Sequence, residues 1–296
     1  MPRAKRAKSK ATGGDAEQLE FGNASKGRLS SRTAAASREL ADTVPPPRRL
    51  GDRLWNALAG VSLLPFVCIV TDALFDTVTS AASRQTQVPF WLSHEFLMFA
   101  IGAGIWMVWL CISLLLWKQP RPVSAYVLGH ELMHMLMARL FRGKIKEYMI
   151  SSEGGYIVTN KYNFLIALAP YLWPFYSVPV LAAWGVSTYW DAASQYQEFF
   201  LGALGLTWMF HLTFTLWILP RGQSDFHGPG RTFSFALIYL ANAALLTGAL
   251  VIFAPEVTWR GYARTLWTST LDFYDWAGDS VARLTHLLAQ LLAGGG

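Results

Sequence analysis

Six long apolar stretches follow one another along most of the chain and constrain its fold more than any other feature. They cover residues 54–75, 90–117, 126–141, 163–186, 199–219 and 233–253. A helix needs about 20 residues to cross the hydrocarbon core of a membrane. Five stretches reach this length, whereas the third is marginal. We therefore predict an all-α polytopic membrane protein with about six membrane helices, of which the third either spans the membrane or is re-entrant.

The charged residues are few and unevenly distributed. Asp, Glu, Lys and Arg make up 15% of the 296 residues, against roughly a quarter in soluble domains. Residues 1–53 hold 12 Lys or Arg and 6 Asp or Glu, so they account for the whole net charge of +6. This basic segment predicts an integral, multi-pass membrane protein whose N-terminus is cytoplasmic, with the lipid bilayer as a partner.

Three regions of different composition follow from this pattern. Residues 1–50 lack apolar periodicity and predict a disordered tail, a solvated arm rather than a segment that binds nucleic acid. Residues 51–256 form the predicted membrane domain. Residues 257–296 interleave Leu and Trp with Arg, Asp and His, which predicts an interfacial amphipathic helix. Within the membrane domain, the alternating segment 143–163 ("GKIKEYMISSEGGYIVTNKYN") predicts a short β-hairpin.

The third apolar stretch contains the pattern HExxH, which begins at His130 and ends at His134. On a helix, residues four apart lie on one face, so both imidazoles can ligate one metal ion, and zinc is the usual occupant. Glu131 lies about 100° around the helix, where it can reach a water molecule at the metal. The pattern therefore predicts a Zn²⁺ site in which Glu131 is the general base for hydrolysis.

Other interpretations of these membrane histidines fit less well. Haem ligation needs axial histidines on opposite sides of the ring, and two histidines on one helical face supply only one of them. Membrane di-iron enzymes use several histidine clusters, whereas this chain has six scattered histidines. The alternative is that His130 and His134 only pack in the protein core and bind no metal. Ionisable groups inside a membrane segment are costly, however, and usually functional.

These residues resemble the site-2 protease group of intramembrane zinc metalloproteases, the M50-like peptidases. The resemblance covers about residues 126–240 and includes "GHELMH" on a membrane helix, the strand-like segment "GKIKEYMISSEGGY" after it, and "ALAP" in the next helix. It implies an intramembrane endopeptidase that hydrolyses peptide bonds in or near transmembrane segments of membrane proteins. It also implies an aspartate, later in the chain, as the third zinc ligand.

The third ligand has four candidates in this sequence. Asp225 in "LPRGQSDFHGPG" is our choice, although the family has Asp-Gly where this chain has Asp-Phe. A capping or turn role is the alternative for an aspartate in such a loop. His211 lies within an apolar segment, where an ionisable side chain is costly and is usually functional. His227 and Glu153 complete the candidates.

The positions of the basic residues indicate whether His130 and Asp225 can lie on the same side of the membrane. If the third stretch crosses the membrane, His130 and Asp225 approach it from opposite faces. If it dips in and returns, the basic residues that follow it are cytoplasmic, and so is Asp225. Because positive residues favour the cytoplasmic side, the second arrangement is preferred, and it places the predicted ligands on one face.

The predicted hairpin supplies a candidate substrate-binding edge. Gly154, Gly155 and Tyr156 could pair with the backbone of an extended membrane-protein or peptide substrate, although a simple surface hairpin is an equal alternative. The sequence therefore predicts a zinc-dependent membrane metalloendopeptidase. The alternative function is a catalytically inactive scaffold or transporter-like protein that retains the fold.

Overall fold

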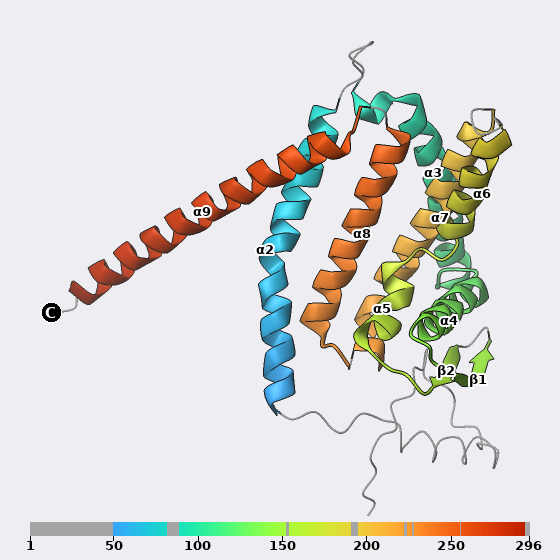
Figure 1. The fold of residues 1–296 in the computed structure, drawn as a ribbon, viewed down its shortest axis with the longest axis horizontal. Helices are drawn as coiled ribbons and strands as arrows, with labels where there is room; N and C mark the ends of the chain where they lie inside the picture. The colour runs from blue at the N-terminus through green and yellow to red at the C-terminus, as the bar shows by residue number, and fades with distance from the viewer. Residues whose placement is uncertain are drawn as a thin grey trace, which may run out of the picture.

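The structure, a computed structural model, describes residues 50–81, 89–151, 154–190, 195–221, 224–226, 228–254 and 256–293. Apart from Leu50, the predicted N-terminal tail lies outside these residues. The described chain is mostly helical, with one small antiparallel hairpin (Figure 1).

Eight α-helices form the body of the molecule. They are α2 (Leu50–Ser80), α3 (His94–Trp117), α4 (Val123–Leu140), α5 (Phe164–Leu172), α6 (Ser177–Ser187), α7 (Gln197–Ile218), α8 (Arg231–Phe253) and α9 (Trp259–Ala293). Four 3₁₀ turns connect them: η1 (Phe90–Leu92), η2 (Thr188–Trp190), η3 (Leu219–Arg221) and η4 (Ser224–Phe226). The strands are β1 (Ile145–Ile150) and β2 (Gly155–Thr159).

Within the part of the chain that the structure describes, four helices are long and apolar enough to cross a membrane, which is compatible with a multi-pass membrane protein. The apolar segments are Leu54–Ser80, His94–Trp117, Gln197–Arg221 and Arg231–Ile252. The bent pair α5 and α6, with 70° between its helices, gives a fifth if the two count as one broken span. The sequence predicted about six membrane helices, of which the third, α4, either spans the membrane or is re-entrant. Helix α4 is the one that does not qualify as a span, because its ionisable residues make its 18 residues too polar.

Helices α3 and α7 pack closely because small residues line their contact. A Cβ atom added at Gly102 would come within 1.8 Å of the Gly202 carbonyl oxygen, and one at Gly205 within 2.0 Å of the Phe99 carbonyl oxygen. Glycine at these positions therefore lets the two backbones approach, as in many membrane helix pairs. Further along the same pair, the indole of Trp106 donates a hydrogen bond of 2.8 Å to Thr213.

The predicted hairpin is confirmed and lies beside α4 (Figure 1). Strands β1 and β2 are antiparallel, with Ile150 opposite Gly155 and Ile145 opposite Thr159, and an irregularity between Ile145 and Glu147. Gly154, in the turn, has φ +151°, a conformation that favours glycine. Helix α5 then begins at Asn163, whose side chain accepts a hydrogen bond from the Ile166 amide and caps the helix.

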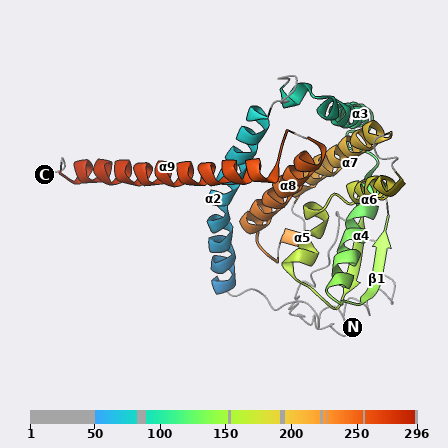
Figure 2. The same ribbon diagram turned by 45° about the horizontal axis from the view of Figure 1, so that its top comes forward.

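Helix α9 begins near the end of α8 and packs with its first half against α2. Ser269 is the one residue of α9 that is fully buried among those described. The second half projects away from the other helices (Figure 2), and every residue from Val281 to Ala293 is exposed. The region predicted as an amphipathic helix is thus one long helix.

Candidate metal centre

Helix α4 presents the three ionisable residues of the HExxH pattern to the interior of the molecule. His130, Glu131 and His134 are all at most 5% exposed, and the Nε2 atoms of the two histidines lie 3.1 Å apart. Because they are one helical turn apart, they share a face. Their arrangement follows directly from the sequence pattern.

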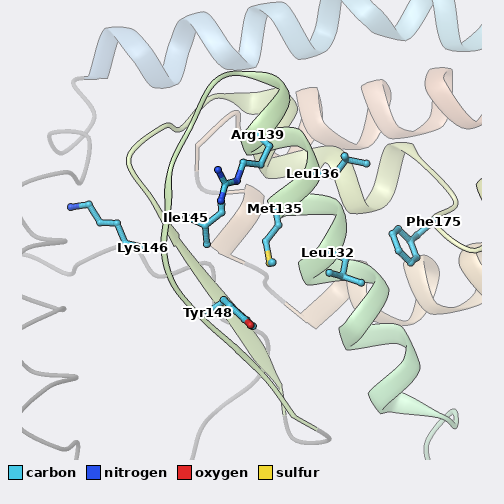
Figure 3. Close-up of a pocket in the computed structure, with 8 residues that line it drawn as sticks. All are labelled: Leu132, Met135, Leu136, Arg139, Ile145, Lys146, Tyr148 and Phe175. Atoms are coloured by element: carbon cyan, nitrogen blue, oxygen red, sulfur yellow. The ribbon is translucent and has the colours of Figure 1, made fainter.

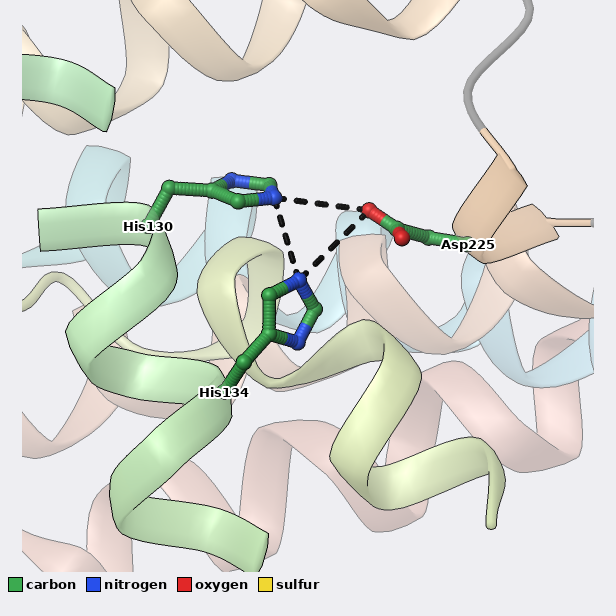
Figure 4. A group of neighbouring side chains, drawn as sticks. All are labelled: His130, His134 and Asp225. Carbon is green, nitrogen blue, oxygen red and sulfur yellow. Dashed lines mark hydrogen bonds and ion pairs between the residues drawn. The ribbon is translucent and has the colours of Figure 1, made fainter. Parts of the chain in front are cut away.

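Asp225 joins the two histidines from a distant part of the chain. The turn η4 places Asp225 Oδ2 at 3.4 Å from His130 Nε2 and at 3.8 Å from His134 Nε2 (Figure 4). Its side chain is 3% exposed. The three residues form a buried group that could hold a metal ion.

The separations between these atoms fit a zinc ion. Zn–N and Zn–O bonds of about 2.0–2.2 Å in a tetrahedron place the ligand atoms roughly 3.3–3.6 Å apart. The observed distances of 3.1, 3.4 and 3.8 Å bracket that value. Three protein ligands would leave the fourth position open, which is typical of catalytic rather than structural zinc sites.

Each candidate ligand has a hydrogen-bond partner behind it. His134 Nδ1 donates to the Ile166 carbonyl at 2.8 Å, which leaves Nε2 with its lone pair toward the centre. His130 Nδ1 lies 3.2 Å from the Tyr126 hydroxyl. The Tyr171 hydroxyl donates to Asp225 Oδ2 at 2.6 Å. Such outer partners fix the tautomer and orientation of metal ligands.

The loop between α7 and α8 is held so that Asp225 points inward. Phe226 is buried, and its ring packs at 5.1 Å from that of Tyr171. Gly228 lies against the Tyr162 ring, so that a Cβ there would meet the Tyr162 hydroxyl oxygen at 1.8 Å. Gly230, with φ +89°, begins α8. Aromatic packing and glycine together position the carboxylate.

The electrostatic environment of Asp225 favours its charged form. Burial would raise the pKa of Asp225, but the hydrogen bond from His130, the positive charge of the two imidazoles when they are protonated, and the Tyr171 hydroxyl outweigh it, so that the pKa is lowered. An ionised, buried carboxylate is the form that binds a cation.

Glu131 lies beside this group and against the hairpin. A Cβ added at Gly155 would be 2.9 Å from Glu131 Oε1 and 2.7 Å from its Cγ, so only glycine fits here without displacing the carboxylate. Glu131 Oε2 is buried and makes no hydrogen bond to a described residue. A buried carboxylate oxygen without a donor is costly.

The other sequence candidates are placed differently. His211 is buried on α7, next to Asn242 and the Tyr171 carbonyl, and is not part of the ligand group. His227 and Glu153 lie outside the described residues. Tyr156 follows Gly155 and so faces the opposite side of the hairpin, where its hydroxyl donates to Glu147 at 2.6 Å.

The outer partners of the ligands were not predicted from the sequence. Tyr126 is four residues before His130, and this helical spacing was a usable signal. Tyr171 and the Ile166 carbonyl belong to α5, and no local pattern connects them with the motif.

Comparison with protein-family models, curated proteins and solved structures finds no match for this chain.

Proposed function

We propose that this protein is a zinc-dependent membrane metalloendopeptidase. His130, His134 and Asp225 would hold Zn²⁺, and Glu131 would act as general base. The observation that carries the proposal is the buried group of two imidazoles and one carboxylate, with mutual distances of 3.1–3.8 Å, beside a buried glutamate. The M50-like resemblance of the motif and of the hairpin after it supports the same assignment.

The chemistry follows from the ligand set. A bound zinc ion supplies a Lewis acid that polarises a peptide carbonyl and lowers the pKa of water. Glu131 is next to His130 in the chain, is buried with it and interacts electrostatically with Asp225, so it would take the proton of the attacking water and pass it to the leaving amine. A purely structural zinc site needs no base at this position.

A groove lies between α4 and β1 on the outer side of α4, and its lining includes none of the ligand residues (Figure 3). Its volume is about 500 Å³, and its lining is mainly apolar: Leu132, Met135, Leu136, Ile145, Tyr148 and Phe175, with Arg139 and Lys146. The substrate would be a membrane-protein segment in extended form, paired with the hairpin backbone. Gly155 would keep the hairpin close to Glu131.

The charge distribution supports a cytoplasmic position for this end of the molecule. The N-terminal end of α2 and the hairpin lie at the same end of the bundle (Figure 1). Basic residues gather on the segments around the site, among them Lys118, Arg121, Arg139, Arg142 and Lys144. By the positive-inside rule, this end and the N-terminus would face the cytoplasm.

The substitution Glu131→Gln tests the proposal. It removes the base but leaves the metal ligands intact, so the variant should retain zinc while cleavage of a co-expressed membrane-protein substrate falls by at least about 100-fold. Glu198→Gln, a change at an exposed residue of α7 away from the ligand group and the hairpin, is the control. Normal cleavage by Glu131→Gln would contradict the role of this residue. No cleavage by the wild-type protein, with zinc bound, would favour a non-catalytic scaffold.

A further inference from the structure

Helix α5 (Phe164–Leu172) contains a buried proline, Pro170, in its interior. Proline has no backbone N–H, and its ring crowds the carbonyl group four residues earlier, so it is the least favourable residue inside a helix. The carbonyl group that loses its helical donor in this way is that of Ile166. Because a buried carbonyl group without a partner costs stability, this group needs a donor from outside its own helix.

The imidazole of His134 supplies that donor. Its Nδ1 atom lies 2.8 Å from the Ile166 carbonyl oxygen, and both residues are at most 1% exposed. A carbonyl oxygen can only accept a hydrogen bond, so Nδ1 must carry the proton. The lone pair of the neutral ring is then on Nε2, the atom that faces His130 and Asp225 (Figure 4).

A bend between α5 and α6 is the ordinary explanation for a proline in this region, but the bend lies elsewhere. The two helices are 70° apart, and the break between them follows Leu172. Another proline, Pro174, occupies that break, and its carbonyl accepts a hydrogen bond of 2.9 Å from the Ser177 amide. Pro170 lies one turn earlier, within the helix, so the change of direction does not require it.

We propose that Pro170 is a positioning residue for the metal centre. It frees the Ile166 carbonyl, and this carbonyl holds His134 in the tautomer that has its proton on Nδ1 and its lone pair on Nε2. A hydrogen bond at the far nitrogen is the usual way in which a protein orients a metal-binding histidine. The inference rests on the proposed zinc site and deepens it, because it names a residue that acts on one ligand through the backbone of α5.

The substitution Pro170→Ala tests this inference because alanine restores an N–H group and returns the helical donor to the Ile166 carbonyl. The hydrogen bond to His134 should weaken, and zinc affinity should fall by about 10-fold. Equilibrium dialysis of the full-length protein in detergent measures the affinity. Pro65→Ala is the matched control, because Pro65 is also inside a helix, α2, which carries none of the three proposed ligands. Its zinc affinity should equal that of the wild type.

The tautomer of His134 in the metal-free protein gives a readout that is independent of zinc and of cleavage. Nitrogen NMR of protein labelled at its histidines distinguishes a protonated ring nitrogen from one with a lone pair. The signals of His134 are those that disappear in a His134→Gln variant. The wild type and Pro65→Ala should carry the proton on Nδ1, whereas a fraction of Pro170→Ala should carry it on Nε2.

Two results would overturn the inference. A wild-type, metal-free protein with the His134 proton on Nε2 would exclude the hydrogen bond to Ile166, and this result needs no substitution. Equal zinc affinities and equal tautomers of Pro170→Ala and Pro65→Ala would show that Pro170 does not determine the state of the ring. The expected change of tautomer in a protein that binds no zinc would support the role of Pro170 and contradict the peptidase proposal, so the two failures are distinguishable.

Discussion

Two histidine–carboxylate pairs at opposite ends of the bundle show what burial does to the same chemistry. His94 and Glu198 connect α3 with α7 at 2.8 Å, and their side chains are 59% and 66% exposed. His130 and Asp225 are further apart, at 3.4 Å, but each is 3% exposed. The shorter pair is the one surrounded by solvent, whereas the buried pair keeps a distance that suits an ion between its atoms.

This difference separates a surface contact from a binding site. An exposed ion pair contributes little because water screens it and its side chains must be ordered. A buried pair must overcome a large desolvation cost, and here a second histidine and the Tyr126 and Tyr171 hydroxyls accompany it. Such a buried group could hold a metal ion, and substitutions at the two ends can test this.

Asp225→Ala should have the largest effect because it removes a ligand and leaves two histidines on one helix. Loss of an outer partner typically lowers metal affinity by about 10–100-fold. Loss of a direct ligand should lower the zinc affinity further, and cleavage should fall with it. Equilibrium dialysis with zinc measures the affinity. If the variant binds zinc as tightly as the wild type, Asp225 is not a ligand.

Tyr171→Phe should have an intermediate effect. The substitution keeps the buried ring and removes only the hydroxyl that donates to Asp225 Oδ2, so zinc affinity should fall by about 10-fold. Tyr239→Phe is the matched control, because its hydroxyl bonds to Thr71 at 2.6 Å away from the ligand group. Equal affinities of the two variants would show that the Tyr171 hydroxyl does not support the ligand.

His94→Gln should have the smallest effect. The exposed pair with Glu198 should be worth less than about 1 kcal/mol, so the unfolding temperature should fall by less than about 4 °C. The difference should shrink further at high salt, and zinc affinity should not change. A loss of zinc in this variant would mean that the two ends of the bundle are coupled, contrary to the comparison above.

The sequence predicted those features that depend on local pattern. Apolar stretches of sufficient length predicted the long helices, alternation around Gly154 and Gly155 predicted the hairpin, and HExxH predicted the two facing histidines. Asp225 was placed with them through charge distribution and family resemblance, not through spacing. These predictions depend on residues close together in the sequence or on the preference of basic residues for the cytoplasmic side of a membrane.

The remaining features depend on contacts between distant segments. The sequence already indicated from charge distribution that α4 need not span the membrane, but which distant segments pack around it came only with the fold. Tyr171 comes near Asp225, 54 residues later, because aromatic packing with Phe226 joins their segments. The same applies to Gly155, whose contact with Glu131 depends on how the hairpin turns back on α4.

The coordination of the metal in the purified wild-type protein tests the central claim most directly. X-ray absorption at the zinc edge should give about one zinc per chain with two imidazole nitrogens and one or two oxygens at about 2.0–2.2 Å. Spectra of the Asp225→Ala variant provide the reference for a lost oxygen ligand. A protein that binds no zinc after loading, or a zinc shell without two imidazoles, would contradict the account.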